Sequence, residues 1–104
     1  MIFRRKPFGV VIQRQLDLFV TDHADVLADV AERLRLWNAA GREEAEELYG
    51  DYVDAFETGT ELLADARDHF AATLAEPEAD AYRREFDRAV AKRLPTFALE
   101  LENR

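Results

Sequence analysis

Apolar residues recur every three or four positions along residues 12–37, the spacing that places side chains on one face of an α-helix. This stripe consists of Ile12, Leu16, Phe19, Val26, Val30 and Trp37, and is widened by Val20, Leu27 and Leu34. One polar residue, His23, interrupts it. The pattern predicts a single amphipathic helix over about residues 8–39, ended by a turn at 38–42 that contains Gly41.

A second apolar stripe of the same period predicts a helix from about Glu43 to about Ala75. Its members are Ala45, Leu48, Tyr52, Phe56, Gly59, Leu63, Ala66 and Phe70. Several acidic residues open this segment, where the positive end of the helix dipole favours them. Glycine in a helix interior costs about 1 kcal/mol relative to alanine. We expect one continuous helix, but a kink or break at Gly50 or Gly59 is left open.

A third and shorter helix is predicted to begin at Pro77, because proline suits the first turn of a helix. Its apolar face consists of Tyr82, Phe86, Ala89, Val90 and Leu94. Pro95 then stops or kinks it. In the extension at 95–104, apolar residues alternate as in a strand, although Phe97 and Leu101 also share one helical turn. Since the chain has no other strand signal, we expect a short helix or an ordered extension there.

The two long helices are expected to pair as an antiparallel hairpin about Gly41. Each residue i then lies roughly opposite residue 82 − i, so that Ile12 faces Phe70 and His23 faces Gly59. A large ring against a residue without a side chain suits a packed seam. The predicted fold is therefore all-α, with a long antiparallel helical hairpin and a shorter third helix.

The third helix is about half as long as the other two and cannot cover both apolar stripes. Exposed apolar area of that size usually marks an interface. We therefore predict that dimerisation completes the bundle, as a homodimer or higher oligomer, or that a partner protein covers the stripe. The predicted interface residues are Ile12, Leu16, Phe19, Val26, Val30, Trp37, Phe56, Leu63 and Phe70.

The composition is that of one folded domain spanning residues 1–104, with a basic N-terminal segment at 1–7. Hydrophobic residues make up 48% of the chain and charged residues 35%. There is no cysteine and no serine, so disulfides, thiolate zinc sites and the usual thiol or serine nucleophiles are excluded. Without a signal peptide or a run of about 20 apolar residues, we expect a cytoplasmic protein with no transmembrane segment.

The net charge of −8 argues against nucleic-acid binding, which needs a basic surface. The charge is unevenly distributed, with ten carboxylates and one arginine in residues 43–68 and five basic residues in 83–93. Such complementary patches favour helix pairing within or between chains. A cluster of three positive charges, Arg4, Arg5 and Lys6, is the one candidate for contact with a membrane surface.

His23 is the first candidate for chemistry, because imidazole is the commonest transition-metal ligand and the usual base near neutral pH. The alternative is a neutral core histidine that bonds to a threonine or to backbone, and we favour it. The second imidazole, His69, would lie about 15 Å away along a single hairpin, although an antiparallel dimer could bring the two together. The remaining carboxylate rows are expected to face water.

One family resemblance is carried by the LDLF segment (residues 16–19), the helical seam after it, and a second long helix with Glu57-x-x-x-Glu61. Over residues 16–75 the chain resembles the PhoU-like phosphate-transport regulators. The resemblance implies an all-helical bundle in which acidic E/D-x-x-x-D motifs hold metal clusters. Asp25-x-x-x-Asp29 matches that form, whereas the Glu57 motif departs from it at Glu61. The chain is about half as long as the family's proteins.

Two functions follow. The first is a non-enzymatic interaction or regulatory bundle, acting through homo-oligomerisation or a partner helix and without a cofactor. The alternative is a metal-binding bundle, PhoU-like or a small ferritin-like assembly, that uses His23, His69 and nearby carboxylates, with Glu57 and Glu61 as the resemblance implies. No glycine-rich phosphate loop or nucleophile–base pair supports catalysis.

Overall fold

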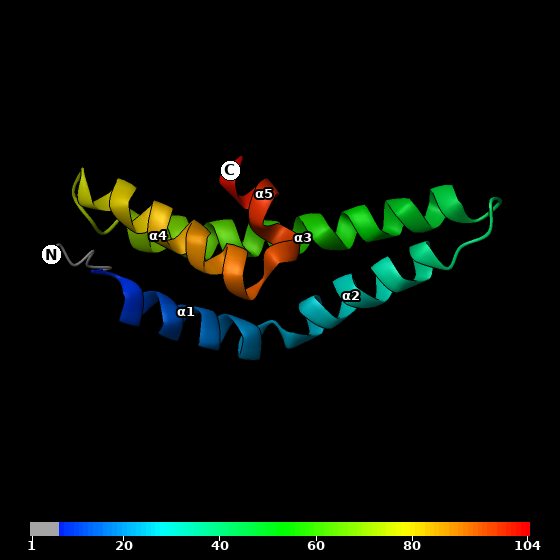
Figure 1. The fold of residues 1–104 in the computed structure, drawn as a ribbon, viewed down its shortest axis with the longest axis horizontal. Helices are drawn as coiled ribbons and strands as arrows, with labels where there is room; N and C mark the ends of the chain where they lie inside the picture. The colour runs from blue at the N-terminus through cyan, green and yellow to red at the C-terminus, as the bar shows by residue number, and fades with distance from the viewer. Residues whose placement is uncertain (1–6) are drawn as a thin grey trace, which may run out of the picture.

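The computed structural model describes residues 7–104, and the regular structure in that range is entirely helical. The elements in order are α1 (Gly9–Asp22), α2 (Ala24–Asn38), α3 (Ala45–Ala71), α4 (Glu78–Arg93), the 3-10 helix η1 (Pro95–Phe97) and α5 (Ala98–Glu102). The predicted all-α class is confirmed. The molecule is elongated, with extents of 56 × 30 × 24 Å (Figure 1).

The first predicted helix is not continuous, because the chain breaks it at His23. This residue has φ −116° and ψ 30°, outside the helical range, and it both ends α1 and begins α2. Its backbone N–H still donates to the Phe19 carbonyl at 2.9 Å. The break redirects the axis, so that α2 runs along α3 while α1 turns to follow α4 (Figure 1).

The hairpin prediction holds for α2 and α3, which form the largest helix–helix contact of the described chain. The turn between them contains Gly41, whose carbonyl accepts the N–H of Ala45 at 3.0 Å. α3 then runs without interruption for 27 residues, through both Gly50 and Gly59. The question that the sequence left open is thus answered in favour of one helix.

The predicted register fails in the other half of the hairpin. α1 packs against α4 rather than along α3. The Tyr82 ring of α4 contacts Phe8 at a centroid distance of 5.5 Å and Phe70 of α3 at 4.7 Å. The predicted pairing of Ile12 with Phe70 is therefore replaced by contacts through the third helix.

Gly59 does accept a large ring, but the ring is not His23. A Cβ built on Gly59 would lie 2.7 Å from Cε1 of Phe97. Pro95 ends α4, and η1 with α5 folds the tail back across the bundle, which buries Phe97 and Leu101. The predicted short C-terminal helix is confirmed, and this tail takes the place that the sequence assigned to His23.

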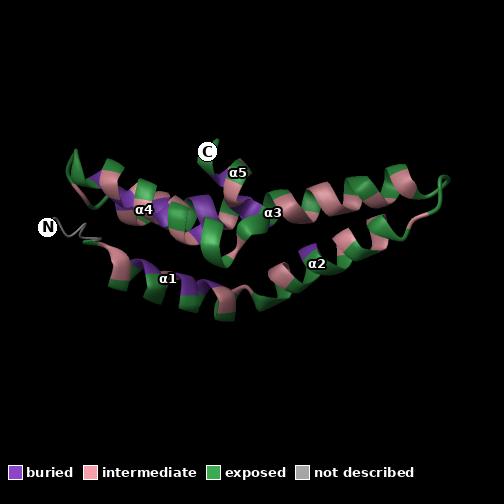
Figure 2. Ribbon diagram, in the orientation of Figure 1, coloured by how far each residue is buried: buried purple, intermediate pink, exposed green. Residues whose placement is uncertain are grey.

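Burial is concentrated where three or more helices meet (Figure 2). The core consists of Ile12, Leu16, Phe19, Val30, Leu63, Ala64, Ala71, Ala79, Tyr82, Phe86, Val90, Phe97 and Leu101. The far end of α2 and α3 contains half-buried rather than buried side chains. None of the helices in residues 7–104 has the length and apolar character needed to cross a bilayer.

Candidate functional site

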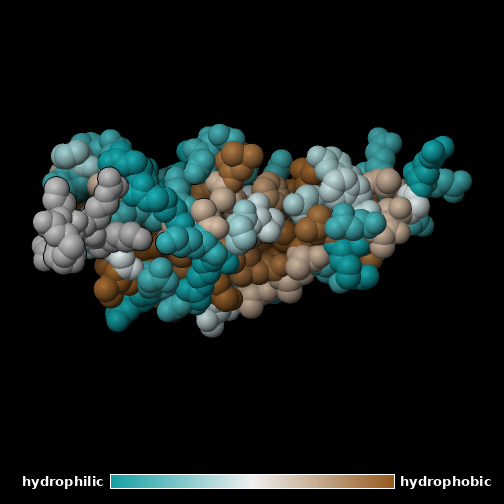
Figure 3. Space-filling view, in the orientation of Figure 1, coloured by the Kyte–Doolittle hydropathy of each residue, from teal (hydrophilic) through white to brown (hydrophobic). Residues whose placement is uncertain are grey.

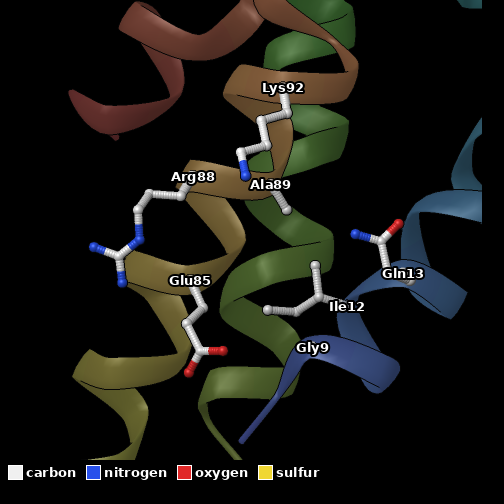
Figure 4. A pocket seen from close by; sticks show the side chains of 7 residues that line it. All are labelled: Gly9, Ile12, Gln13, Glu85, Arg88, Ala89 and Lys92. Atoms are coloured by element: carbon white, nitrogen blue, oxygen red, sulfur yellow. The ribbon is translucent and has the colours of Figure 1, made fainter. Parts of the chain in front are cut away.

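Two clefts lie in series where α4 and η1 run opposite α1 and α2. The first, of about 110 Å³, separates α1 from α4 (Figure 4). It is lined by Gly9, Ile12, Gln13, Glu85, Arg88, Ala89 and Lys92. Figure 4 shows Ile12 pointing from α1 toward α4, whereas the Arg88 side chain extends away from α1. The cleft thus has an apolar floor and a charged rim.

The second cleft, which we call the groove, has a volume of about 310 Å³ and lies between α2 and the α4–η1 junction. It is lined by Leu27, Val30, Ala31, Leu34, Arg93, Leu94, Pro95, Thr96 and Phe97. Val30 and Phe97 are buried at its base, whereas Leu27, Leu34 and Leu94 are half-buried. The groove is therefore an apolar surface with few polar groups, as in sites that receive an apolar side chain or helix face.

Residues 24–58 form a two-helix hairpin that we call the arm, which supplies one wall of the groove through α2 and extends beyond it. A chain of aromatic contacts runs along it. Trp37 contacts Tyr49 at a centroid distance of 4.8 Å and stacks on Tyr52 at 5.8 Å. Tyr52 contacts Phe56 at 5.8 Å, and Phe56 stacks on Phe97 at 5.6 Å. Because only two helices form the arm, Trp37, Tyr52 and Phe56 are half-buried there and Tyr49 is 49% exposed.

The molecular surface supports the same description (Figure 3). Hydrophobic residues follow the boundary between α1–α2 and the helices drawn above them, and they continue toward the arm. Hydrophilic residues dominate the surface on both sides of this boundary. The residues that line the first cleft and the groove follow one another along α4 and η1. The candidate site is therefore the groove together with the adjoining face of the arm.

A buried ion-pair network holds the opposite side of the bundle together. Arg67 is 3% exposed and donates hydrogen bonds to Asp87 at 2.9 Å, to Asp68 at 2.8 Å and to the Leu101 carbonyl at 3.0 Å. It thereby joins α3, α4 and α5. Burial and the loss of hydration would raise the pKa of Asp68, but hydrogen bonds from Arg67 and Arg83 outweigh this and lower it.

The partner carboxylate behaves differently. Burial raises the pKa of Asp87, and the hydrogen bond from Arg67 offsets only part of that effect. Burial would also lower the pKa of Arg67, but its bonds to the two aspartates raise it instead. Since each polar group is bonded within the chain, the network explains packing rather than catalysis.

A second polar contact joins α1 to α4. The Tyr82 hydroxyl donates to Oε1 of Gln15 at 2.7 Å, and burial raises the pKa of Tyr82 to about 12. Nearby, Arg93 pairs with Asp17 at 2.5 Å. Within the described part of the chain, every buried side-chain nitrogen and oxygen has a hydrogen-bond partner. These contacts fix α1 on α4 and thereby shape both clefts.

The structure separates the predicted metal ligands from any common site. His23 is half-buried at the α1–α2 break, and its ring contacts Phe19 at a centroid distance of 4.8 Å. His69 is exposed in the last turn of α3, and Glu57 and Glu61 are exposed further back on the same helix. Across residues 7–104, no three histidine or carboxylate side chains are grouped so as to hold a metal ion. The basic residues at 4–6 lie outside the described residues.

The predicted interface residues divide into two groups. Ile12, Leu16, Phe19, Val30 and Leu63 are at most 5% exposed within one chain, so a second copy cannot contact them. Val26, Trp37, Phe56 and Phe70 are half-buried, and the first three belong to the arm.

Sequence reasoning missed the groove wall at 94–97 and the role of Arg67. Arg67 is the one arginine among ten carboxylates in residues 43–68, and it lies four residues after Leu63 on the buried stripe. That position is the signal that could have revealed it. By contrast, nothing in the periodicity indicates that the tail after Pro95 folds back onto α3.

Neither a protein-family model, nor a curated protein, nor a solved structure matches this sequence. The resemblance to the PhoU-like regulators stays a prediction. The function is therefore argued from the groove, the arm and their charges.

Proposed function

We propose that this protein is a non-catalytic helical interaction module that binds a second copy of itself through the arm and the groove. The observation that supports this is that α4 does not extend along the whole length of the arm. It ends at Arg93, so beyond the groove α2 and α3 cover only each other. A two-helix layer cannot bury the apolar faces of both helices, and completing it with two more helices makes a four-helix bundle.

The composition of the uncovered face agrees with a protein–protein contact. Trp37 and Tyr49 lie at the tip of the arm and contact each other, and tryptophan and tyrosine are enriched among the residues that carry binding energy. Leu27 and Leu34 line the groove at half burial. An apolar groove beside an amphipathic helix is the usual geometry for receiving another helix.

A self-association measurement tests the proposal. Sedimentation equilibrium of the full chain from about 1 to about 100 μM is expected to show a concentration-dependent dimer. Leu34→Glu places a charge in the groove and should raise the dimer Kd at least about tenfold. Leu99→Glu is the matched control, because Leu99 is 75% exposed on α5 and does not line the groove.

The outcomes separate clearly. A wild-type chain that is monomeric at the highest concentration overturns the proposed function. Equal Kd values for wild type and Leu34→Glu place the contact elsewhere. Circular dichroism checks that each variant is folded. If Leu34→Glu is unfolded, Thr96→Glu replaces it, because Thr96 is exposed on the groove wall.

A further inference from the structure

Two sets of like charges lie at opposite ends of the groove and arm. The tip of the arm carries four exposed carboxylates, on Glu43, Glu44, Glu46 and Glu47, against one exposed cation, Arg42, so its charge is predominantly negative. The first cleft, at the other end, borders an exposed basic row on α4. Its members, Arg84, Arg88 and Lys92, follow one another at intervals of four residues and so share one helix face.

These charges differ from four arginines of the same chain in lacking an ion-pair partner among the described residues. Arg33, Arg35, Arg83 and Arg93 each form an ion pair with a carboxylate of the same chain. Among residues 7–104, by contrast, neither the four glutamates of the tip nor the three cations of the basic row belong to any ion pair within 4.0 Å. Within residues 7–104 the acidic tip and the basic row are thus free to pair with another chain, as is the exposed acidic row Glu57, Glu61 and Asp65 of α3, which lies outside the tip.

Twofold symmetry brings the two surfaces together. Two arms that pack side by side in opposite directions place the tip of each copy beside the base of the other. The base is where α4 ends and the groove begins, with Lys92 on the rim of the first cleft and Arg93 on the wall of the groove. Because α2 has 15 residues, the tip and the base of one arm are about 20 Å apart. In an antiparallel dimer the two tip-to-base contacts are therefore separated by about the same distance.

We propose that the second copy binds antiparallel, with its aromatic tip at the groove and its acidic tip on the basic row of the first copy. Trp37 and Tyr49 supply the apolar contact, and Glu43, Glu46 and Glu47 face Arg88 and Lys92. This inference rests on the proposed function and specifies its geometry. The opposite charges exclude the parallel arrangement, in which acidic tip would meet acidic tip.

Charge exchange between two variants tests this geometry. One variant carries Glu43→Lys, Glu46→Lys and Glu47→Lys, and the other carries Arg88→Glu and Lys92→Glu. Each alone places like charges at both contacts of its homodimer, so its dimer Kd should rise at least about tenfold at low salt. An equimolar mixture restores opposite charges at both contacts, and native mass spectrometry should show predominantly the heterodimer.

A matched control carries Glu57→Lys, Glu61→Lys and Asp65→Lys, which changes the net charge by the same amount on an exposed row of α3 outside the tip. Its dimer should keep the wild-type Kd. If the control weakens the dimer as much as the tip variant, or the mixture gives no heterodimer, the antiparallel geometry is wrong. If wild type dimerises and the tip and basic-row variants do so equally well, the proposed function stands and this geometry falls.

A monomeric wild type would instead overturn the proposed function itself. One further measurement tests whether a lipid surface, rather than a second copy, occupies the basic row. Co-sedimentation with phosphatidylserine-containing vesicles that is lost in Arg88→Glu/Lys92→Glu, with an unchanged dimer Kd, would assign the row to a lipid surface. That result would also overturn the antiparallel geometry.

Discussion

The ring of Phe97 lies directly against the backbone of Gly59. A methyl group at Gly59 would approach Cε1 of that ring to 2.7 Å and Cζ to 3.0 Å. The ring also stacks on Phe56, one turn earlier in α3, with an interplanar angle of 9°. Glycine at this position lets the tail after Pro95 close over α3 and form one wall of the groove.

We expect Gly59→Ala to destabilise the fold. Alanine favours a helix interior by about 1 kcal/mol over glycine, but overpacking a well-filled site typically costs about 1–3 kcal/mol, since Phe97 would have to move. The net free energy of unfolding should therefore fall, by up to about 2 kcal/mol. Urea denaturation followed by circular dichroism at one fixed protein concentration measures the change.

Gly50→Ala is the control in the same helix. Gly50 is exposed, and a Cβ there would meet nothing within 4 Å. Only the helix preference operates, so the free energy of unfolding should rise by up to about 1 kcal/mol. An equal gain at both glycines would show that Phe97 does not restrict Gly59.

The second prediction concerns the buried guanidinium of Arg67. Arg67→Met removes the hydrogen bonds to Asp87 and to the Leu101 carbonyl but retains most of the side-chain length. The Asp87 side chain, only 18% exposed, then loses its partner. Removing one member of a buried ion pair costs about 3–5 kcal/mol, which thermal and urea unfolding would detect as loss of most of the stability.

Two further variants test the reason for that loss. Replacing Asp87 by Leu in the Arg67→Met background should recover part of the stability, since no unpaired charge remains. Arg35→Met breaks the solvent-exposed pair with Glu32 and should leave the free energy of unfolding nearly unchanged. Similar losses for Arg67→Met and Arg35→Met would contradict a structural role for the network.

The helical period identified the helical segments of this fold because each carries an apolar stripe along most of its length. It did not identify the break at His23, since no proline or glycine lies there. The break depends on α1 packing against α4 while α2 packs against α3, which is a tertiary effect. The ring that fills the space at Gly59 was misassigned for the same reason, because Phe97 reaches it only after the chain reverses at Pro95.

The candidate site was predictable only in part. The half-length third helix correctly indicated that the hairpin would be covered unevenly, and the acidic and basic segments were visible in the sequence. Five of the nine predicted interface residues are buried within the chain, and for the three on α1 the reason is that α4 packs directly onto the α1 stripe. The surface that remains open is the arm, whose position depends on where α4 ends.

The third prediction concerns unequal stability along α3, a single helix with two environments. Its second half contains Thr60, Leu63, Arg67 and Ala71, all buried, whereas residues 45–55 belong to the arm and contain no buried residue. Amide hydrogens in 45–55 should therefore exchange at least about tenfold faster than those in 60–71 in dilute protein.

Hydrogen exchange also links this prediction to self-association. At a protein concentration where the dimer is populated, the amides of 45–55 should become slower, because the second copy covers the arm. The amides of 60–71 should change less. Uniform exchange along α3, or slowing confined to 60–71, would contradict the assignment of the arm as the open surface.

The last prediction concerns alkaline pH and the Tyr82 hydroxyl. Burial raises the pKa of Tyr82 to about 12, against an ordinary value of 10.0. Between these two values the unfolded chain has lost the phenolic proton while the folded chain retains it, so the unfolded state binds fewer protons and stability falls as pH rises. The buried neutral phenol thus contributes stability that is fully present below about pH 10 and is lost progressively up to about pH 12.

Tyr82→Phe isolates this effect. The variant loses the hydrogen bond to Gln15, which should cost about 0.5–1.5 kcal/mol at neutral pH. Between about pH 10 and 12 the wild type should lose about 2–3 kcal/mol more than the variant, since only the wild type must bury an ionising group. Urea unfolding at several pH values measures the difference, with Tyr49→Phe as the control, because Tyr49 is 49% exposed. Parallel curves for wild type and Tyr82→Phe would show that the phenol ionises without cost and that Tyr82 does not fix α1 on α4.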